Sequence, residues 1–328
     1  MNNSIKKKLC VVAAAFSALS FIGCGSEQPE SAFDNPLPWH DAVSGSYEQL
    51  DYTVAVYDTT TGAAEDARTR IADGAVSFRL EEVENAEYTR VYMSFSVTYA
   101  ADAPAPDAGL TDTIESSVEF VSNSLAVRSM HKELSLADRE GVENRSYVLD
   151  ADYFDTHKAT YRETRKENAA ERTISLPQNT CHDNEMMFYL ARAQGVGSGS
   201  STMFRMINVF DSVNTGSLVR YEMVAAGSES KSTVDLGDWV SAFGVAAVTD
   251  EATGATSYPI SCYTTTISIN EEKHGPPYIV QYSEKPFKQG SREHGKIPVR
   301  ISYSEYYGSA PRRYTEYTLS SCSFTKPQ

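Results

Sequence analysis

Residues 91–99 read VYMSFSVTY, and this segment decides the fold class. Its odd-numbered positions are all apolar or aromatic, while three of its four even-numbered positions are Ser or Thr. Successive side chains of a β-strand point to opposite faces, so this period of two predicts a strand with one face on a core. Burial of one face only is typical of antiparallel sheets.

The same alternation recurs on both sides of this segment. We expect strands near residues 48–57, 75–83, 88–99, 113–121, 124–132, 145–151, 157–164, 171–176, 203–210, 217–225, 230–236, 258–270, 277–284, 297–305 and 312–321. Turn-forming residues separate several of them, including Asp73-Gly74 and Gly227. With 20 tyrosines in 328 residues, the composition also favours strands, and the chain is predicted to be mainly β.

One helix is predicted between the strands at 171–176 and 203–210. Asp183 or Asn184 can cap its start, and apolar residues follow at helical spacing. Phe188 and Tyr189 widen its apolar surface, so we expect it to be buried against the sheet. The segment 237–248 fits either a short helix or an apolar loop.

The first 23 residues differ from the rest of the chain. Three lysines at positions 6–8 precede an uncharged apolar run from Leu9 to Ile22. This run is shorter than the roughly 20 residues that a membrane-spanning helix needs, and it fits the apolar region of a signal peptide.

The end of this run resembles the lipobox of bacterial lipoproteins. Residues 21–24 read FIGC, in which Gly23 matches the family pattern and Phe21 stands where Leu is preferred. The resemblance implies cleavage between Gly23 and Cys24, with acylation of Cys24 by palmitate or a similar chain. The protein would then be anchored in the cell membrane or the outer membrane, facing away from the cytoplasm. An ordinary secretory signal that contains a cysteine is the alternative.

These patterns predict three parts. Residues 1–23 form the lipoprotein signal peptide, and residues 24–46 form a flexible tether between lipid and body. Residues 47–328 form a single antiparallel β domain, in which 47–178 and 179–328 are candidate lobes.

The second half has an order of segments that resembles a known family. These segments are 183–192, 258–263, 278–283, 296–301 and 313–319. They resemble uncharacterised bacterial envelope proteins whose fold is similar to that of the Lol-type lipoprotein carriers. The resemblance implies a long antiparallel sheet curled into an incomplete barrel, with one helix against its concave face. From the alternation alone, a β-sandwich is the alternative.

Cys181, Cys262 and Cys322 remain after the signal peptide and the lipid anchor, so a monomer holds at most one disulfide. In a meander of the last four strands, Cys262 and Cys322 lie about 14 Å apart, beyond the ~7 Å that a disulfide tolerates. Cys181 is therefore the better partner for either Cys262 or Cys322. Buried free thiols are the alternative.

The sequence carries no common motif for catalysis, metals or cofactors. The six histidines form no HExxH, and no CxxC or GxSxG occurs, so we expect no metal and no cofactor. Cys181, His182 and Asp183 are adjacent, which is compatible with an activated thiol, but a structural helix cap is the favoured interpretation. The net charge of -15 argues against a nucleic-acid partner.

The functional hypothesis is a membrane-anchored, non-catalytic binding or carrier module for a lipid or other apolar ligand in the concave sheet. An interaction protein of the cell envelope is the alternative, and a hydrolase with an unrecognised site is the third hypothesis. The tyrosines and arginines between 303 and 317 would form either a recognition surface or cross-strand pairs.

Overall fold

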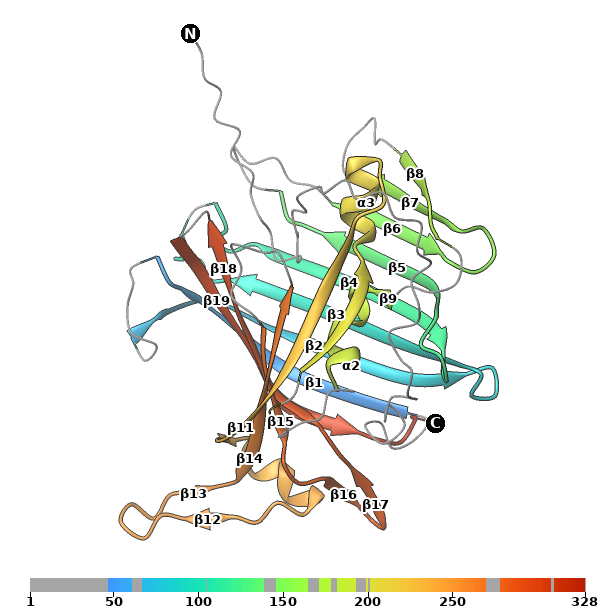
Figure 1. The fold of residues 1–328 in the computed structure, drawn as a ribbon. Coiled ribbons are helices and arrows are strands. Elements are labelled where there is room, and N and C mark those ends of the chain that lie inside the picture. The colour runs from blue at the N-terminus through green and yellow to red at the C-terminus, as the bar shows by residue number, and fades with distance from the viewer. Residues whose placement is uncertain are drawn as a thin grey trace.

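The computed structural model describes residues 47–60, 67–104, 106–138, 146–164, 171–177, 182–192, 199, 201–269, 278–307 and 310–327. The predicted signal peptide and tether, with Gly23 and Cys24, lie outside these residues. The described strands include fifteen that form one sheet, drawn in Figure 1. The chain is therefore mainly β, as predicted, and it is built on one sheet rather than on the two sheets of a sandwich.

The first half of the chain is a meander of eight antiparallel strands. They are β1 (Tyr47–Asp58), β2 (Thr69–Val83), β3 (Tyr88–Tyr99), β4 (Thr111–Val121), β5 (Val127–Ser135), β6 (Tyr147–Asp152), β7 (Lys158–Glu163) and β8 (Glu171–Ser175). Each strand pairs with the one before it, so β8 lies at one edge of the sheet.

The second half starts at the opposite edge and returns to β1. Its strands in the same sheet are β9 (His182–Asp183), β10 (Ser201–Ile207), β11 (Arg220–Asp235), β14 (Pro259–Ile269), β15 (Tyr278–Ser283), β18 (Pro298–Tyr307) and β19 (Ala310–Ser323). β19 pairs with β1, so both halves share one continuous sheet. Every pair is antiparallel except the short β9–β10 pair.

Short elements complete the fold. They are the helices η2 (Asn184–Met186), α2 (Met187–Arg192), α3 (Val209–Thr215) and η3 (Asp238–Phe243), and the hairpins β12 (Val248–Thr249) with β13 (Thr256–Ser257) and β16 (Phe287–Gln289) with β17 (Arg292–His294). The hairpins and η3 lie together at the lower end in Figure 1. There the ring of Phe243 packs 5.7 Å from that of Phe287. No helix in the described part of the chain is long and apolar enough to cross a membrane.

The connection between the two edges requires the sheet to curl. β8 ends at Ser175 and β9 begins at His182, yet they are the opposite edges of fifteen strands. A flat sheet of that size would be about 67 Å wide, whereas seven residues reach at most about 25 Å. Because β8 and β9 are not paired with each other, the curled sheet is an incomplete barrel, as predicted.

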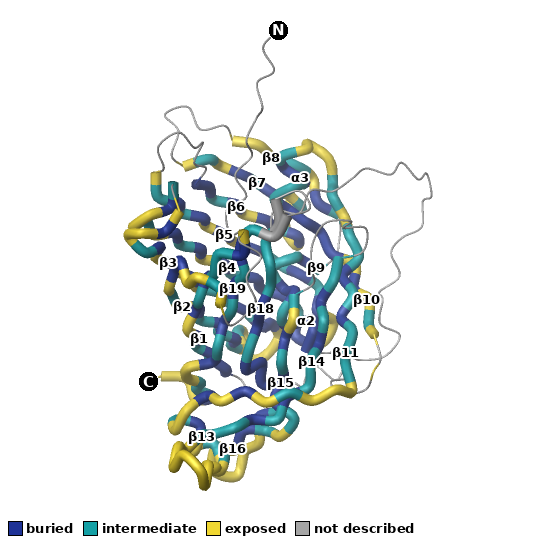
Figure 2. Tube along the Cα trace, turned by 90° about the vertical axis from the view of Figure 1, so that its left-hand side faces the viewer, coloured by how far each residue is buried: buried dark blue, intermediate teal, exposed yellow. Residues whose placement is uncertain are grey.

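The inside of the curl forms the core. Leu50, Tyr52, Val54 and Val56 of β1 are all buried, and buried positions alternate with more exposed ones along β3 to β6 (Figure 2). The rings of Phe95 on β3 and Tyr317 on β19 lie 6.1 Å apart. In a flat sheet these strands would be about 14 Å apart, so the curl brings their inner faces into contact.

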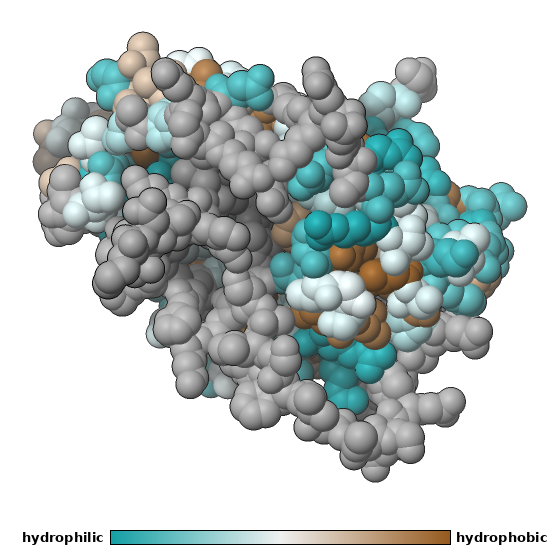
Figure 3. Space-filling view, turned by 90° about the horizontal axis from the view of Figure 1, so that it is seen from above, coloured by the Kyte–Doolittle hydropathy of each residue, from teal (hydrophilic) through white to brown (hydrophobic). Residues whose placement is uncertain are grey.

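Helix α3 covers the inner face of β6 and β7. The ring of Phe210 lies 4.8 Å from that of Tyr147 and 5.8 Å from that of Tyr161. Seen from above, a patch of hydrophobic side chains lies among hydrophilic ones on the right-hand side of the molecule (Figure 3). Helix α3 lies on the same side in Figure 1. The sequence predicted a strand here, through residue 210. Instead the strand ends at Ile207, and Asn208 caps a helix by accepting a hydrogen bond from the backbone N–H of Asp211.

Two turns predicted at glycines are wrong, because each of these glycines lies inside a strand. Asp73-Gly74 lies inside β2, where the missing side chain of Gly74 lets the backbone of β3 approach closely. Gly227 lies inside β11, which is one strand with an irregular register between Gly227 and Lys231. A glycine in a strand thus marks close approach or a bulge here, rather than a chain reversal.

Candidate functional site

Three strand residues on the inner face of the sheet keep exposed surface. Met93 is half-buried although its same-face neighbours Val91 and Phe95 are buried. Tyr278 at the start of β15 and Tyr303 of β18 are also half-buried, although Val280 and Ile301, two positions away on the same face, are buried. Phe188 of α2 is half-buried as well. Inward-facing apolar groups that are not completely covered are the residues to which a small apolar molecule would bind.

These residues belong to a closed series of contacts around the interior, which we call the aromatic circuit. Its rings are those of Phe78, Phe188, Tyr278, Tyr303, Tyr317 and Phe95, with centroid separations of 5.7, 5.5, 4.9, 5.9 and 6.1 Å in that order. Met93 completes it, since it lies opposite Phe78 in the register and two residues before Phe95. The circuit joins α2 to five strands of the sheet.

Phe188 is the member that bridges the curl. Its ring contacts Phe78 of β2 on one side and Tyr278 of β15 on the other. These strands would be about 19 Å apart in a flat sheet. The predicted helix is thus confirmed against the concave face, and its position decides how the interior is lined.

Polar contacts hold both ends of this helical segment. Near its start, Nζ of Lys132 on β5 lies 2.6 Å from Oε1 of Glu185. At its end, Arg192 makes a two-pronged contact with Glu48 of β1, at 2.5 and 3.1 Å. All four side chains are about nine-tenths buried or more, so these pairs fix the segment to two distant strands.

The cap at Asp183 is confirmed as structural. Its carboxylate accepts hydrogen bonds from the backbone N–H of Glu185 at 2.9 Å and from the hydroxyl of Tyr153 at 2.7 Å. Burial, reinforced by the charge of Glu185, raises the pKa of Asp183 to about 7. The neighbouring His182 is half-buried, and desolvation lowers its pKa to about 4 despite its contact with the carbonyl of Leu125.

The two neighbours give opposite pH dependences of stability. A carboxyl whose folded pKa is raised to about 7 stabilises most at low pH, and this contribution is lost as pH rises from about 4 to 7. A histidine whose folded pKa is lowered to about 4 loses its contribution as pH falls over the same window. In the wild type these effects partly cancel.

Asp183→Asn is therefore expected to change the slope of stability against pH. Relative to the wild type, its free energy of unfolding should rise with pH by up to about 1 kcal/mol per unit between pH 4 and 7. Urea titrations at four pH values in that window measure the difference. Parallel curves for the two proteins would show that Asp183 does not titrate there.

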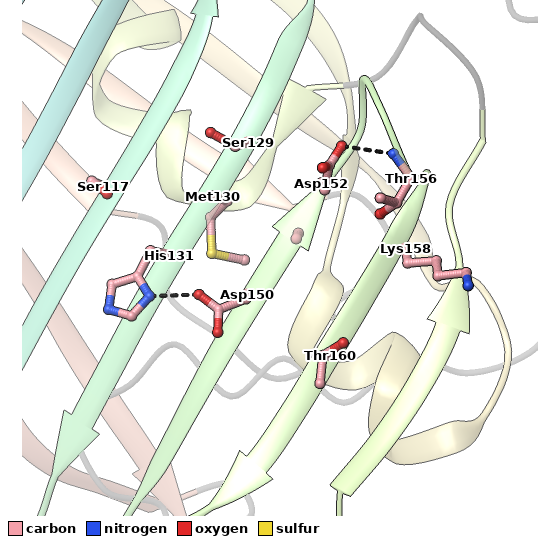
Figure 4. Close-up of a pocket in the computed structure, with 10 residues that line it drawn as sticks. Ser117, Ser129, Met130, His131, Asp150, Asp152, Thr156, Lys158 and Thr160 are labelled. Carbon is pink, nitrogen blue, oxygen red and sulfur yellow. Dashed lines mark hydrogen bonds and ion pairs between the residues drawn. The ribbon is translucent and has the colours of Figure 1, made fainter.

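A second feature is a shallow depression of about 460 Å³ on the outer face of β4 to β7 (Figure 4). It is lined by Ser117, Ser129, Met130, His131, Asp150, Ala151, Asp152, Thr156, Lys158 and Thr160. Nδ1 of His131 lies 2.7 Å from Oδ1 of Asp150, and both side chains are exposed. Although partial burial opposes it, backbone hydrogen bonds from residues 154–156 lower the pKa of Asp152.

Ser117, His131 and Asp150 are neighbours in the strand register, which invites comparison with a hydrolytic triad. Figure 4 shows the His131 ring turned toward Asp150, and no hydrogen bond joins it to Ser117 among the described contacts. The neighbouring backbone N–H groups lie in paired strands, where ladder hydrogen bonds occupy them, so they are poorly placed to stabilise an oxyanion. This geometry does not support the hydrolase hypothesis.

The two cysteines that the structure describes are not bonded to each other. Cys262 is buried and Cys322 is half-buried, and they lie on strands three spacings apart. Their predicted partner Cys181 lies outside the described residues, so its pairing with either one stays a prediction. Burial raises the pKa of the Cys262 thiol to about 12, which makes it a weak nucleophile.

The tyrosines and arginines near the C-terminus do not share one surface. Tyr303 and Tyr317 face the interior, where their hydroxyls lie 3.2 Å apart, and Arg313 is also buried. Arg300 lies on the other face of β18 and pairs with Glu316. This separation supports cross-strand pairing over a single recognition surface.

Comparison with known proteins assigns this chain to no family. No protein family model and no curated protein matches the chain. A Brucella abortus crystal structure, described as a beta-barrel-like protein of domain of unknown function DUF1849, has a TM-score of 0.48 and 10% identity, covering 87% of this chain and 100% of that one. A DUF1329 family protein from Desulfovibrio piger has a TM-score of 0.20 and 8% identity, with 87% and 88% covered.

Proposed function

We propose that this protein is a lipid-anchored, extracytoplasmic binding protein that holds an apolar ligand inside the curled sheet. The observation that carries the proposal is the incomplete burial of Met93, Phe188, Tyr278 and Tyr303 on a face that is otherwise core. Aromatic rings supply large apolar contact area, and covering them releases water at a favourable free energy. Cys24 would carry the anchor, and residues 24–46 would give the body its reach from the membrane.

Filling the interior tests this proposal. Met93→Trp places a larger side chain beside Phe78 in the circuit, so binding of an apolar ligand should weaken at least about tenfold. Residues 25–328, which include every described strand and helix, are exported without the lipid anchor and purified. Native mass spectrometry then detects bound molecules, and uptake of the uncharged probe N-phenyl-1-naphthylamine gives the affinity.

Ile279→Trp is the matched control. Ile279 is next to Tyr278 on β15 but faces outward, with 42% of its surface exposed. The same added bulk there should leave probe affinity unchanged. Equal affinities in both variants, or a wild type that takes up no apolar molecule, would contradict the proposal.

The alternative, an interaction protein, has one observation in its favour. The edge strand β8 pairs only with β7 among the described strands, and most of its residues are exposed. An unpaired edge can add a strand from another protein. If the wild type is empty and binds no probe, this second function becomes the better conclusion.

A further inference from the structure

A half-buried glutamate with one buried carboxylate oxygen that has no hydrogen-bond partner lies beside the aromatic circuit. Glu305 is two residues after Tyr303 on β18, so both side chains are on the inner face. Oε1 of Glu305 is buried and makes no hydrogen bond in the described structure. Glu305 lies close enough to affect the hydroxyls of Tyr303 and Tyr317. Burial is the main cause that raises the pKa of each tyrosine, and the charge of Glu305 raises it further.

The nearest buried cation is already engaged. Arg313 lies opposite Glu305 in the register, but it pairs with Asp107 and donates a hydrogen bond of 3.0 Å to the hydroxyl of Tyr99. Burial raises the pKa of Glu305, and the charges of Arg313 and of the half-buried Arg312 oppose this rise. Glu305 and Asp107 thus share the buried guanidinium of Arg313, which leaves an excess of acceptors.

Thr315 adds a second unpartnered polar group at the same place. It lies opposite Tyr303 in the register and is completely buried, and its hydroxyl has no partner in the described structure. Buried polar groups are nearly always satisfied, so an orphan hydroxyl and an orphan carboxylate oxygen on adjacent strands indicate a missing polar partner, which must be a donor toward Glu305. The polar residues Glu305 and Thr315 therefore adjoin the aromatic circuit directly, because Tyr303 and Tyr317 lie next to them on β18 and β19.

We infer that the ligand of the interior is a cationic amphiphile: an apolar body against the aromatic circuit and a protonated amine at Glu305. This inference rests on the proposed function. An ammonium group supplies hydrogen-bond donors to Glu305 and Thr315 and complements the excess negative charge. A carboxylate head group would instead meet the acids Glu305 and Asp107, with the hydroxyl of Thr315 as its donor, and would add a third negative charge to the site.

The test compares ligands that differ only in the head group. Dodecylamine, dodecanoic acid and 1-dodecanol displace N-phenyl-1-naphthylamine from residues 25–328 at pH 7.4, below their aggregation limits. We expect dodecylamine to bind at least about tenfold more tightly than dodecanoic acid. In Glu305→Gln this preference should disappear while the affinity for dodecanol stays the same, which also reports that the variant is folded.

Glu133→Gln is the control for net charge. Glu133 is an exposed acid on the outer face of β5, so removing it should leave the amine preference intact. Equal binding of the amine and the acid, or an unchanged preference in Glu305→Gln, overturns this inference while the binding function stands. Failure of all three ligands and the probe to bind overturns the binding function itself.

Discussion

Arg192→Met is expected to lower the free energy of unfolding by about 3–5 kcal/mol. The variant leaves Glu48 buried, with 4% of its surface exposed, and without the guanidinium that it contacts through both oxygens. Removing a buried carboxylate from water is costly unless hydrogen bonds and an opposite charge compensate. The same pair holds the end of α2 to β1, so the variant should also loosen the position of Phe188 in the aromatic circuit.

Removing both charges distinguishes the net contribution of the Arg192–Glu48 pair to stability from the cost of leaving Glu48 buried without a partner. Glu48→Leu combined with Arg192→Met puts apolar side chains in the same space and should recover most of the lost stability. Lys288→Met is a control for loss of a surface cation: its pair with Glu293 is about 60% exposed on both sides. That variant should change stability by less than about 0.5 kcal/mol. Guanidinium titrations monitored by circular dichroism measure all of them.

A loss of less than about 1 kcal/mol in Arg192→Met would contradict a fully desolvated pair. If the double variant were less stable than the single one, the charges would instead be needed for the packing of α2. Either result would change the account of how the interior is closed.

Gly74→Ala is expected to cost more than about 3 kcal/mol or to prevent folding. A Cβ atom at Gly74 would lie 2.0 Å from the carbonyl oxygen of Ser96 and 2.9 Å from Cα of Val97, both backbone atoms of β3. No side-chain rotation relieves this overlap, so β2 and β3 would have to separate near the centre of the sheet.

Gly295→Ala is the matched control, because no atom lies within 4 Å of a Cβ built there. It should change the midpoint of unfolding little. Soluble yield and thermal unfolding of the two variants give the comparison. A folded Gly74→Ala protein with the stability of the wild type would show that β2 and β3 are less closely paired at this point.

Much of the fold could be predicted because it depends on local patterns. Alternation placed most strands of the sheet, and Asp183 marked the helix start through its capping side chain. Where prediction failed, a longer-range contact contributed to the outcome. Gly74 is a strand residue because β3 lies against it. Residues 209–215 have a local cap at Asn208, and Phe210 packs this helix on strands far away in sequence.

The candidate site was predictable only in part. The concave face and the helix against it followed from the resemblance, and Phe188 was recognised as part of the buried helix surface. The aromatic circuit and Glu305 were not recognised, since an inward tyrosine or glutamate has the same spacing as any other strand residue. Their common feature is incomplete burial or a missing partner, and both are properties of the assembled interior.

The sequence by itself determined the strands, their inner and outer faces and the capped helix, because side-chain alternation and capping act between residues close together in the chain. Tertiary structure alone decided that β1 and β19 meet, that the two edges approach each other and that Arg192 finds Glu48 across 144 residues. Such contacts arise from the curl of the whole sheet, and the curl is the sum of small twists at every strand pair that no single segment specifies.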